Sequence, residues 1–381
     1  MSRLLIFCFL LLLIAKSNNS NAHNYVLFGE RQLTDSIPSV YFDKNGNPYP
    51  NHFIPDSVLA ECNGSLESFY YKYPEEFKKI AYNYRCNFNT YSINHVSILN
   101  DSILANVAYA INNSYDKNTP LIFIIHGFRK SFTNKPGVYT SVIDYDIFIH
   151  SWSNLSHKKT GFVRVFWDGT YGEFKMNTKT MKTIFPLFLQ AQQNADAVGL
   201  GLRKLLLNIP HYDISIFAHS LGGQVATAAL FNTQSNNIQT PSNPTINIVL
   251  IAPAIAGLDV FKYYYCRNTS YPFEQHDNYR LYILYNRKDF VLKKKDFIIE
   301  LFGPGPLKHG ATTLGCNYKN EAIKTKIFFN SHFKQSPITL INMTKMLKKC
   351  HHLRCYCANS NLNELIHQMH FNNTNPQTTI N

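Results

Sequence analysis

One serine in the sequence stands where a buried strand would turn directly into a helix. Ser220 follows the apolar run 214–217, with Ala218 two residues before it and Gly222 two residues after it. A turn this tight leaves room only for small residues at those two positions, and it lifts the serine hydroxyl clear of the sheet. The amide of Leu221 then lies free at the amino end of the helix. The pattern predicts a nucleophilic serine; the alternative interpretation is a serine that caps an ordinary helix.

A second apolar run, 121–125, ends in the pair His126-Gly127 and is followed by Phe128. With the Ser220 stretch, it makes the chain resemble an α/β-hydrolase of the lipase and esterase type. In that superfamily the residue after His-Gly donates a backbone N–H to the oxygen that becomes negative as the serine attacks. The resemblance therefore implies that Phe128 and Leu221 form the oxyanion hole. We expect His126 to order the loop rather than to take part in the chemistry.

Two carboxylates compete for the acid, which in this superfamily follows the serine and precedes the histidine. Asp289 ends a short turn after the apolar run 281–284, where most α/β-hydrolases carry their acid. Asp259 lies after an earlier strand. Pancreatic-type lipases carry an aspartate directly before the Pro-Ala pair of that strand, and this chain has Ala252 there. That departure favours Asp289 over Asp259, although either could be an ordinary solvated loop carboxylate.

The expected base is His332. It follows the apolar run 327–329, which we take as the last strand, and precedes a helix expected over residues 337–347. A histidine in the loop after the last strand can reach over the nucleophile. The rival is His352, because residues 350–354 resemble the Cys-x-His-x-Arg segment of pancreatic-type lipases.

The resemblance covers about residues 115–348. Between residues 250 and 336 the chain is also similar to a group of poorly characterised bacterial-type serine hydrolases, and more distantly to pancreatic-type lipases. The implied mechanism uses no cofactor and no metal. A cluster of Cys and His side chains at residues 350–357 lacks the paired spacing of zinc ligands, so disulfides are the expected use of these thiols.

The elements from residue 101 to 348 predict an α/β fold, an α/β-hydrolase domain with a mostly parallel sheet and helices on both faces. Short apolar runs of strand length alternate with helix-length stretches, which is typical of a parallel sheet buried on both sides. The expected helices cover residues 191–207 and 221–231. The expected strands are Leu121–Ile125, Val163–Phe166, Ile214–Phe217, Ile246–Ile251, Leu281–Leu284 and Ile327–Phe329.

The ends of the chain have a different composition. Residues 1–22 predict a signal peptide, because Arg3 precedes an apolar run of a length that suits a leader and is too short to span a bilayer. Residues 23–100 are expected to form an N-terminal extension of unknown role, and residues 349–381 a polar tail anchored by cysteines. The mature chain is therefore expected to be secreted, with no transmembrane segment.

Export also fits the cysteines and the glycosylation sequons. Seven cysteines remain after the leader, enough for up to three disulfides, and Cys62 with Cys86 could hold the N-terminal extension together. A secreted protein with these sequons would be a glycoprotein. The sequons begin at Asn63, Asn100, Asn112, Asn154, Asn268, Asn342 and Asn372.

Charge and composition limit the partners. The formal net charge is +13, but the lysines are scattered among Asn, Ile and Tyr rather than gathered in a stripe, and nothing resembles a nucleic-acid-binding motif. We expect a secreted serine hydrolase that cleaves carboxylic esters, lipid esters first, through an acyl-enzyme on Ser220, with peripheral contact with lipid surfaces. Residues 167–189 could form an acyl pocket, a lid or an ordinary core helix. The alternative functions are a non-catalytic hydrolase-like protein that binds a lipid or other ligand, and an amide- or peptide-cleaving hydrolase.

Overall fold

The structure is a computed structural model that describes most of the chain between residues 25 and 366. The described residues are 25–31, 36–88, 90–128, 130, 132, 140–156, 158–170, 178–232, 239, 241–258, 260–265, 278–292, 314–332, 338–358, 360, 362–363 and 365–366. The expected signal peptide and the candidate acid Asp259 lie outside them.

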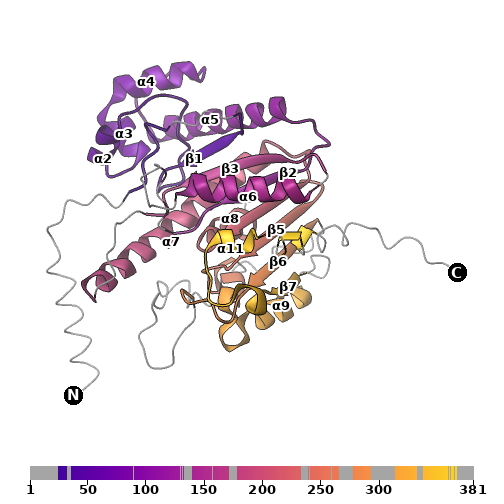
Figure 1. Cartoon of the computed structure of the whole chain (residues 1–381). Coiled ribbons are helices and arrows are strands. Elements are labelled where there is room, and N and C mark those ends of the chain that lie inside the picture. The colour runs from indigo at the N-terminus through magenta and orange to yellow at the C-terminus, as the bar shows by residue number, and fades with distance from the viewer. Residues whose placement is uncertain are drawn as a thin grey trace.

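A seven-stranded sheet forms the centre of the molecule (Figure 1). All neighbouring strands are parallel, in the order β1-β3-β2-β4-β5-β6-β7. Every residue of β2, β3 and β5 is buried, as expected for strands covered on both faces. The predicted parallel α/β sheet is thereby confirmed. The strands are β1 (Ser39–Phe42), β2 (Leu121–Ile125), β3 (Gly161–Trp167), β4 (Ile214–His219), β5 (Ile246–Ile251), β6 (Tyr279–Tyr285) and β7 (Ile338–Asn342).

The strand order reverses direction between β2 and β4. From β2 the chain moves outward to β3, and it then returns across β2 to β4 and continues to β7. Strands β2 and β4 are neighbours, with Ile125 paired to Ala218, so the residues that follow both strands meet at the carboxyl edge. A crevice opens at such a reversal point in open α/β sheets, and it is the usual place for a ligand.

Helices cover both faces of the sheet. Helix α6 (Ser141–Leu155) joins β2 to β3, whereas α8 (Gly222–Phe231) joins β4 to β5 in the opposite direction along the sheet. Right-handed crossovers therefore place α6 and α8 on opposite faces. Helix α11 (Leu353–Tyr356) packs against α6, and both lie in front of the sheet in Figure 1. Helix α7 (Thr178–Leu207) packs against α8 and also against α5 (Ile93–Ser114).

The N-terminal part belongs to the same fold. Strand β1 pairs with β3 at the edge of the sheet, and the boundary expected at residue 100 falls inside α5. The carboxylate of Asp43, fully buried just after β1, accepts hydrogen bonds from the backbone amides of Asn45, Asn47 and Leu66. Burial nevertheless raises the pKa of Asp43 to about 6, because desolvation disfavours its charged form. The helices before α5 are α2 (Asp56–Glu61), α3 (Leu66–Lys72) and α4 (Pro74–Asn83).

The elements expected between residues 321 and 347 are wrong. The apolar run 327–329 lies in helix α9 (Glu321–His332), and the last strand is β7. In place of the helix expected over residues 337–347, the structure has strand β7 followed by the short helix α10 (Thr344–Leu347). The run looked continuous, but Ile327 is 65% exposed while Phe329 is buried, so the residues lie around a helix rather than on one face of a strand. Three further short helices are η1 (Val260–Tyr265), η3 (Leu314–Cys316) and η4 (Tyr318–Asn320).

The cysteines are used differently from the expectation. Cys350 and Cys355 form a disulfide, whereas Cys62 and Cys86 are free, buried thiols that do not bond to each other. The segment after residue 349 is more than a polar tail, because it contains α11 and the buried side chains of Leu362 and Leu365. Among the described residues, no helix is both long and apolar enough to cross a membrane.

Candidate active site

Ser220 occupies the tight turn that the sequence predicts. Strand β4 ends at His219, helix α8 begins at Gly222, and the φ angle of Ser220 is +55°, a left-handed conformation that a serine rarely adopts. Three backbone hydrogen bonds hold this conformation. Ser220 donates its amide to the carbonyl of Ile251 at 2.9 Å, and its own carbonyl accepts from the amides of Ala254 at 3.0 Å and Gly223 at 3.1 Å. Local strain of this kind collects at functional sites.

Two glycines allow the turn and the neighbouring loop to approach each other. A Cβ atom on Gly222 would lie 2.5 Å from the carbonyl oxygen of His126, which is too close for any side chain. A Cβ atom on Gly127 would lie 2.8 Å from the Cβ of Ser220. The loop after β2 therefore packs directly against the serine, and only glycine fits at either contact.

A histidine contacts the serine and the acid at once, but it is His351 and not His332. The Nε2 atom of His351 lies 3.1 Å from the Oγ of Ser220, and its Nδ1 atom lies 2.7 Å from the Oδ2 of Asp289. All three residues are buried, with exposures of 7% for Ser220, 8% for His351 and 0% for Asp289. The three groups form one continuous line from carboxylate to imidazole to hydroxyl, which is the geometry that lets a histidine withdraw the proton of a serine.

The expectation for His332 failed because it depended on a strand that does not exist. His332 is the last residue of α9, which precedes β7, whereas His351 lies in the loop between α10 and α11, after the last strand. His351, and not His332, is therefore the histidine that follows the last strand. The other candidate, His352, is the sequence neighbour of His351, and it is exposed.

The carboxylate of Asp289 is oriented by backbone amides of the residues that follow it. One carboxylate oxygen, Oδ1, accepts hydrogen bonds from the amides of Val291 at 2.9 Å and Leu292 at 3.1 Å. These bonds leave the second oxygen directed at His351. Of the two acids that the sequence offers, the structure brings Asp289 to the histidine.

Asn286 joins the turn that carries the acid to the loop that carries the histidine. Its side-chain amide, which is fully buried, donates to the carbonyls of Lys348 at 3.0 Å and Cys350 at 3.1 Å. Its side-chain oxygen accepts from the amide of Lys288 at 3.0 Å, inside the acid turn. Nothing in the sequence indicates that residues 286 and 348 are adjacent, so this role of Asn286 is visible only in the structure.

His219 connects the nucleophile strand to the same loop. Its Nε2 atom lies 2.8 Å from the carbonyl oxygen of His351, so Nε2 carries the proton and donates it. Burial lowers the pKa of His219 well below its usual value, and the ring stays neutral. His219 therefore positions the backbone of His351 rather than exchanging protons, and no local pattern in the sequence indicates this role.

The two expected oxyanion donors flank the serine. Leu221 directly follows it, and its amide has no hydrogen-bond partner among the described residues. Phe128 directly follows Gly127, which has no room for a Cβ beside Ser220, and the Phe128 ring packs edge-on against Phe188 of α7 at 5.1 Å between centroids. Phe188 lies in the region 167–189 that the sequence offered as an acyl pocket, lid or core helix, and it contacts the loop after β2.

His126 orders the loop after β2, as expected. Its Nδ1 atom lies 2.8 Å from the carbonyl oxygen of Gly127, and its Nε2 atom accepts the amide of Trp167 at 3.2 Å. Burial lowers the pKa of His126 to about 3, so its ring stays neutral and both contacts persist near neutral pH.

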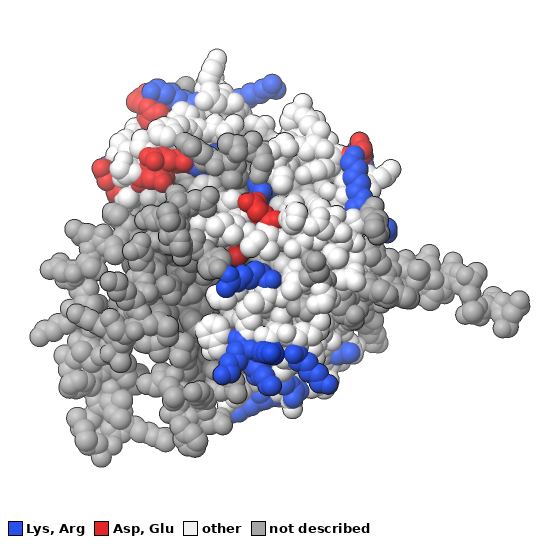
Figure 2. Space-filling model, in the orientation of Figure 1, with Lys and Arg blue, Asp and Glu red and all other residues white. Residues whose placement is uncertain are grey.

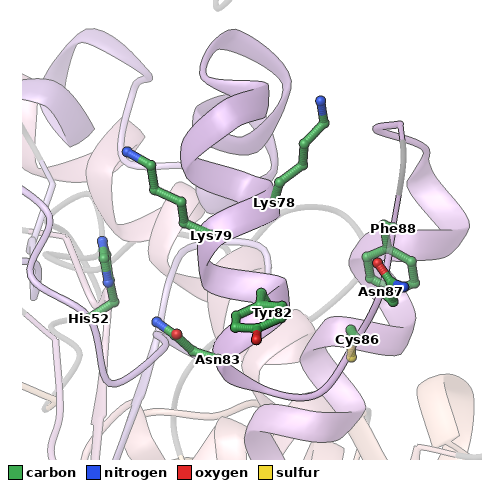
Figure 3. A pocket seen from close by; sticks show the side chains of 8 residues that line it. All are labelled: His52, Lys78, Lys79, Tyr82, Asn83, Cys86, Asn87 and Phe88. Carbon is green, nitrogen blue, oxygen red and sulfur yellow. The ribbon is translucent and has the colours of Figure 1, made fainter.

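The other candidate sites in the part of the chain that the structure describes are a metal site and a surface hollow. Across the described ranges, no three His, Cys, Asp or Glu residues gather as metal ligands, and Cys350 is consumed in a disulfide. A surface hollow of about 600 Å³ lies on the N-terminal helices, and its two lysines are ion-paired with Glu75 and Glu76 (Figure 3). It is lined by His52, Lys78, Lys79, Tyr82, Asn83, Cys86, Asn87 and Phe88.

The parallel sheet, its reversal point and the strained serine beside it define an α/β-hydrolase. A family model described as "Alpha/beta hydrolase of unknown function (DUF900)" matches residues 101–300, and the chain belongs to this family. The matched range includes Ser220 and Asp289 and ends before His351.

Other comparisons add nothing on activity. No protein with a curated description matches the chain. Among solved structures, the crystal structure of SuiB from Streptococcus suis is 10% identical, with 86% of this chain and 74% of that chain covered, at a TM-score of 0.16. A likeness at that TM-score supports no argument on fold or function.

Proposed function

We propose that this α/β-hydrolase is a serine hydrolase that cleaves carboxylic esters through an acyl-enzyme on Ser220. The observation that carries the proposal is the line of contacts from Asp289 through His351 to Ser220, at 2.7 Å and 3.1 Å. The strained turn at Ser220 supports it, because a left-handed serine has no evident structural purpose in an ordinary helix cap.

In the proposed mechanism, the Nε2 atom of His351 takes the hydroxyl proton of Ser220 as its Oγ attacks the ester carbonyl. Asp289 stabilises the positively charged imidazole and fixes the tautomer with Nδ1 protonated. The amides of Phe128 and Leu221 hold the negative oxygen of the tetrahedral intermediate, each contributing about 3 kcal/mol. His351 then gives its proton to the leaving alcohol, and water activated by His351 releases the acid.

Lipid esters are the substrate class that we propose first. The support is the apolar contact of Phe128 with Phe188 beside the proposed oxyanion donors, where an acyl chain would find hydrophobic surface. An ester or other carbonyl compound without such a chain would use the same three residues.

We also propose that the protein is exported and glycosylated. The leader-like sequence at residues 1–22 and the disulfide between Cys350 and Cys355 support export, since disulfides persist in oxidising compartments. Of the sequons, Asn100 is a poor acceptor because its side chain is buried and donates to Asn47. Exposed acceptors are Asn63, Asn112, Asn154 and Asn342.

The experiment that tests the proposal is covalent labelling with a fluorophosphonate, joined to the hydrolysis of a soluble aryl ester. The wild type should be labelled and active, and Ser220→Ala should lose both. His351→Ala should lower kcat by a factor on the order of 10⁴ to 10⁶, as the loss of a triad histidine does. His332→Ala is the matched control and should keep nearly full activity.

Other outcomes would count against the proposal. A folded wild type that neither labels nor hydrolyses esters would favour the alternative, a hydrolase-like protein that only binds its ligand. Labelling without ester turnover would direct attention to amide or peptide substrates. A larger loss in His332→Ala than in His351→Ala would contradict the assignment of the base.

A further inference from the structure

Five cations gather beside the proposed active site and form what we call the basic rim: Arg287, Lys288, Lys345, Lys348 and Lys349. All five are exposed. None of them forms an ion pair with any residue that the structure describes. Cations on a protein surface are usually balanced by nearby carboxylates, so a group left without them produces a local positive field.

The rim comes from two segments that the fold holds side by side. The amide of Arg287 donates to the Oγ1 of Thr344 at 2.9 Å, and the amide of Phe290 donates to the carbonyl of Lys349 at 3.4 Å. One segment leads into the acid Asp289, and the other leads into His351. The rim is therefore adjacent to two of the three groups of the proposed triad.

In the described residues from 278 onward, few acids are present that could neutralise this field. Among the described residues from 278 onward, the acidic residues are Asp289, which is buried against His351, and Glu321. Figure 2 shows Lys and Arg side chains gathered low in the view, where Figure 1 draws α9 and β7, without acidic side chains among them. On the N-terminal helices, by contrast, Glu61, Glu75 and Glu76 are each paired with a lysine.

Two large apolar side chains project from the same two segments. Phe290 is 57% exposed and Met346 is 46% exposed. A single exposed apolar residue needs no explanation. An aromatic ring and a thioether set among unpaired cations, however, match the chemistry of a surface that inserts apolar groups below the head groups of an anionic bilayer.

We propose that the basic rim, with Phe290 and Met346, docks the protein on an anionic lipid surface. Docking through this edge would direct the crevice at Ser220 toward the lipid, because Asp289 and His351 are continuous in sequence with the rim. The docking itself does not require the proposed ester hydrolysis. A second step, that the ester substrate is part of the same lipid surface, rests on the proposed function.

The test measures binding of the full chain to vesicles of phosphatidylcholine with and without phosphatidylserine. All proteins carry Ser220→Ala, so that hydrolysis cannot alter the vesicles and a failure of the proposed enzymatic activity cannot affect the result. The test pair is Lys345→Gln with Lys349→Gln. The matched control pair is Lys117→Gln with Lys158→Gln. These two exposed lysines lie just before β2 and β3, at the amino ends of the strands, whereas the basic rim follows the carboxyl ends of β6 and β7.

The parent protein should bind vesicles that contain phosphatidylserine and should bind them more weakly as salt is added. The test pair should weaken binding about 30-fold, because each lysine near an anionic surface contributes about fivefold. The control pair should change binding by less than about threefold, since its lysines lie outside the contact. Thermal unfolding of each variant should match that of the parent, which shows that the substitutions leave the fold intact.

Three results would overturn the proposal. The first is binding that does not depend on phosphatidylserine. The second is equal weakening of vesicle binding by the test and control pairs, which would show that binding depends on net charge alone. The third is tight binding of an RNA oligonucleotide through the same lysines, with no vesicle binding.

Discussion

The hydrogen bonds of Asn286 predict that this side chain holds the turn of Asp289 and the loop of His351 in their relative positions. The Asn286→Ala substitution removes two donors, to Lys348 and Cys350, and one acceptor, for Lys288. A buried hydrogen bond contributes about 0.5–1.5 kcal/mol net, so the loss of three should lower the free energy of unfolding by about 2–4 kcal/mol.

The effect on activity should exceed what the stability loss alone would cause. Lys348 adopts a left-handed φ of +53°, and the bond from Asn286 to its carbonyl is one of the contacts that hold the loop before His351. A misplacement of a catalytic group by about 1 Å can cost about 100-fold in rate. We therefore expect kcat for a soluble ester to fall at least tenfold under conditions where the variant is fully folded.

The assay combines urea unfolding, which gives the free energy, with steady-state kinetics at a temperature well below the unfolding transition. Asn83→Ala is the control, because Asn83 is exposed on α4 and should change neither quantity measurably. If Asn286→Ala unfolded within about 0.5 kcal/mol of the wild type and kept its kcat, the link between the acid turn and the histidine loop would be refuted.

Two further predictions follow from close contacts and burial. In Gly127→Ala the new Cβ would lie 2.8 Å from the Cβ of Ser220, so kcat should fall at least tenfold. Gly223→Ala is the control: its nearest contact would be 3.3 Å, and its kcat should stay within about threefold of the wild-type value. Ester kinetics on both variants measure the difference. The raised pKa of Asp43, about 6, means that the folded state binds this proton more tightly than the unfolded state, so the stabilisation present below about pH 4 is lost as pH rises through 6. In urea unfolding, the loss should be about 3 kcal/mol larger in the wild type than in Asp43→Asn, and equal pH dependence in the two proteins would contradict the prediction.

Local patterns were enough to predict most of the sheet and the nucleophile. Buried parallel strands are continuous apolar runs, and five of the six predicted runs correspond to β2 through β6 in the structure. The turn at Ser220 could also be predicted from the sequence, because it requires small residues only at the positions two before and two after the serine. Gly222 meets that requirement locally, and the structure gives Ser220 the expected strained backbone.

Only the tertiary structure decided which histidine meets Ser220. The run 327–329 is apolar in either a strand or a helix, and packing around β7 rather than propensity made it part of α9. That choice moved the loop after the last strand from residue 332 to residue 351, which lies 131 positions from Ser220 in the sequence. A contact over that separation depends on the order of strands in the sheet and on bonds such as those of Asn286, and no short-range pattern in the sequence encodes either.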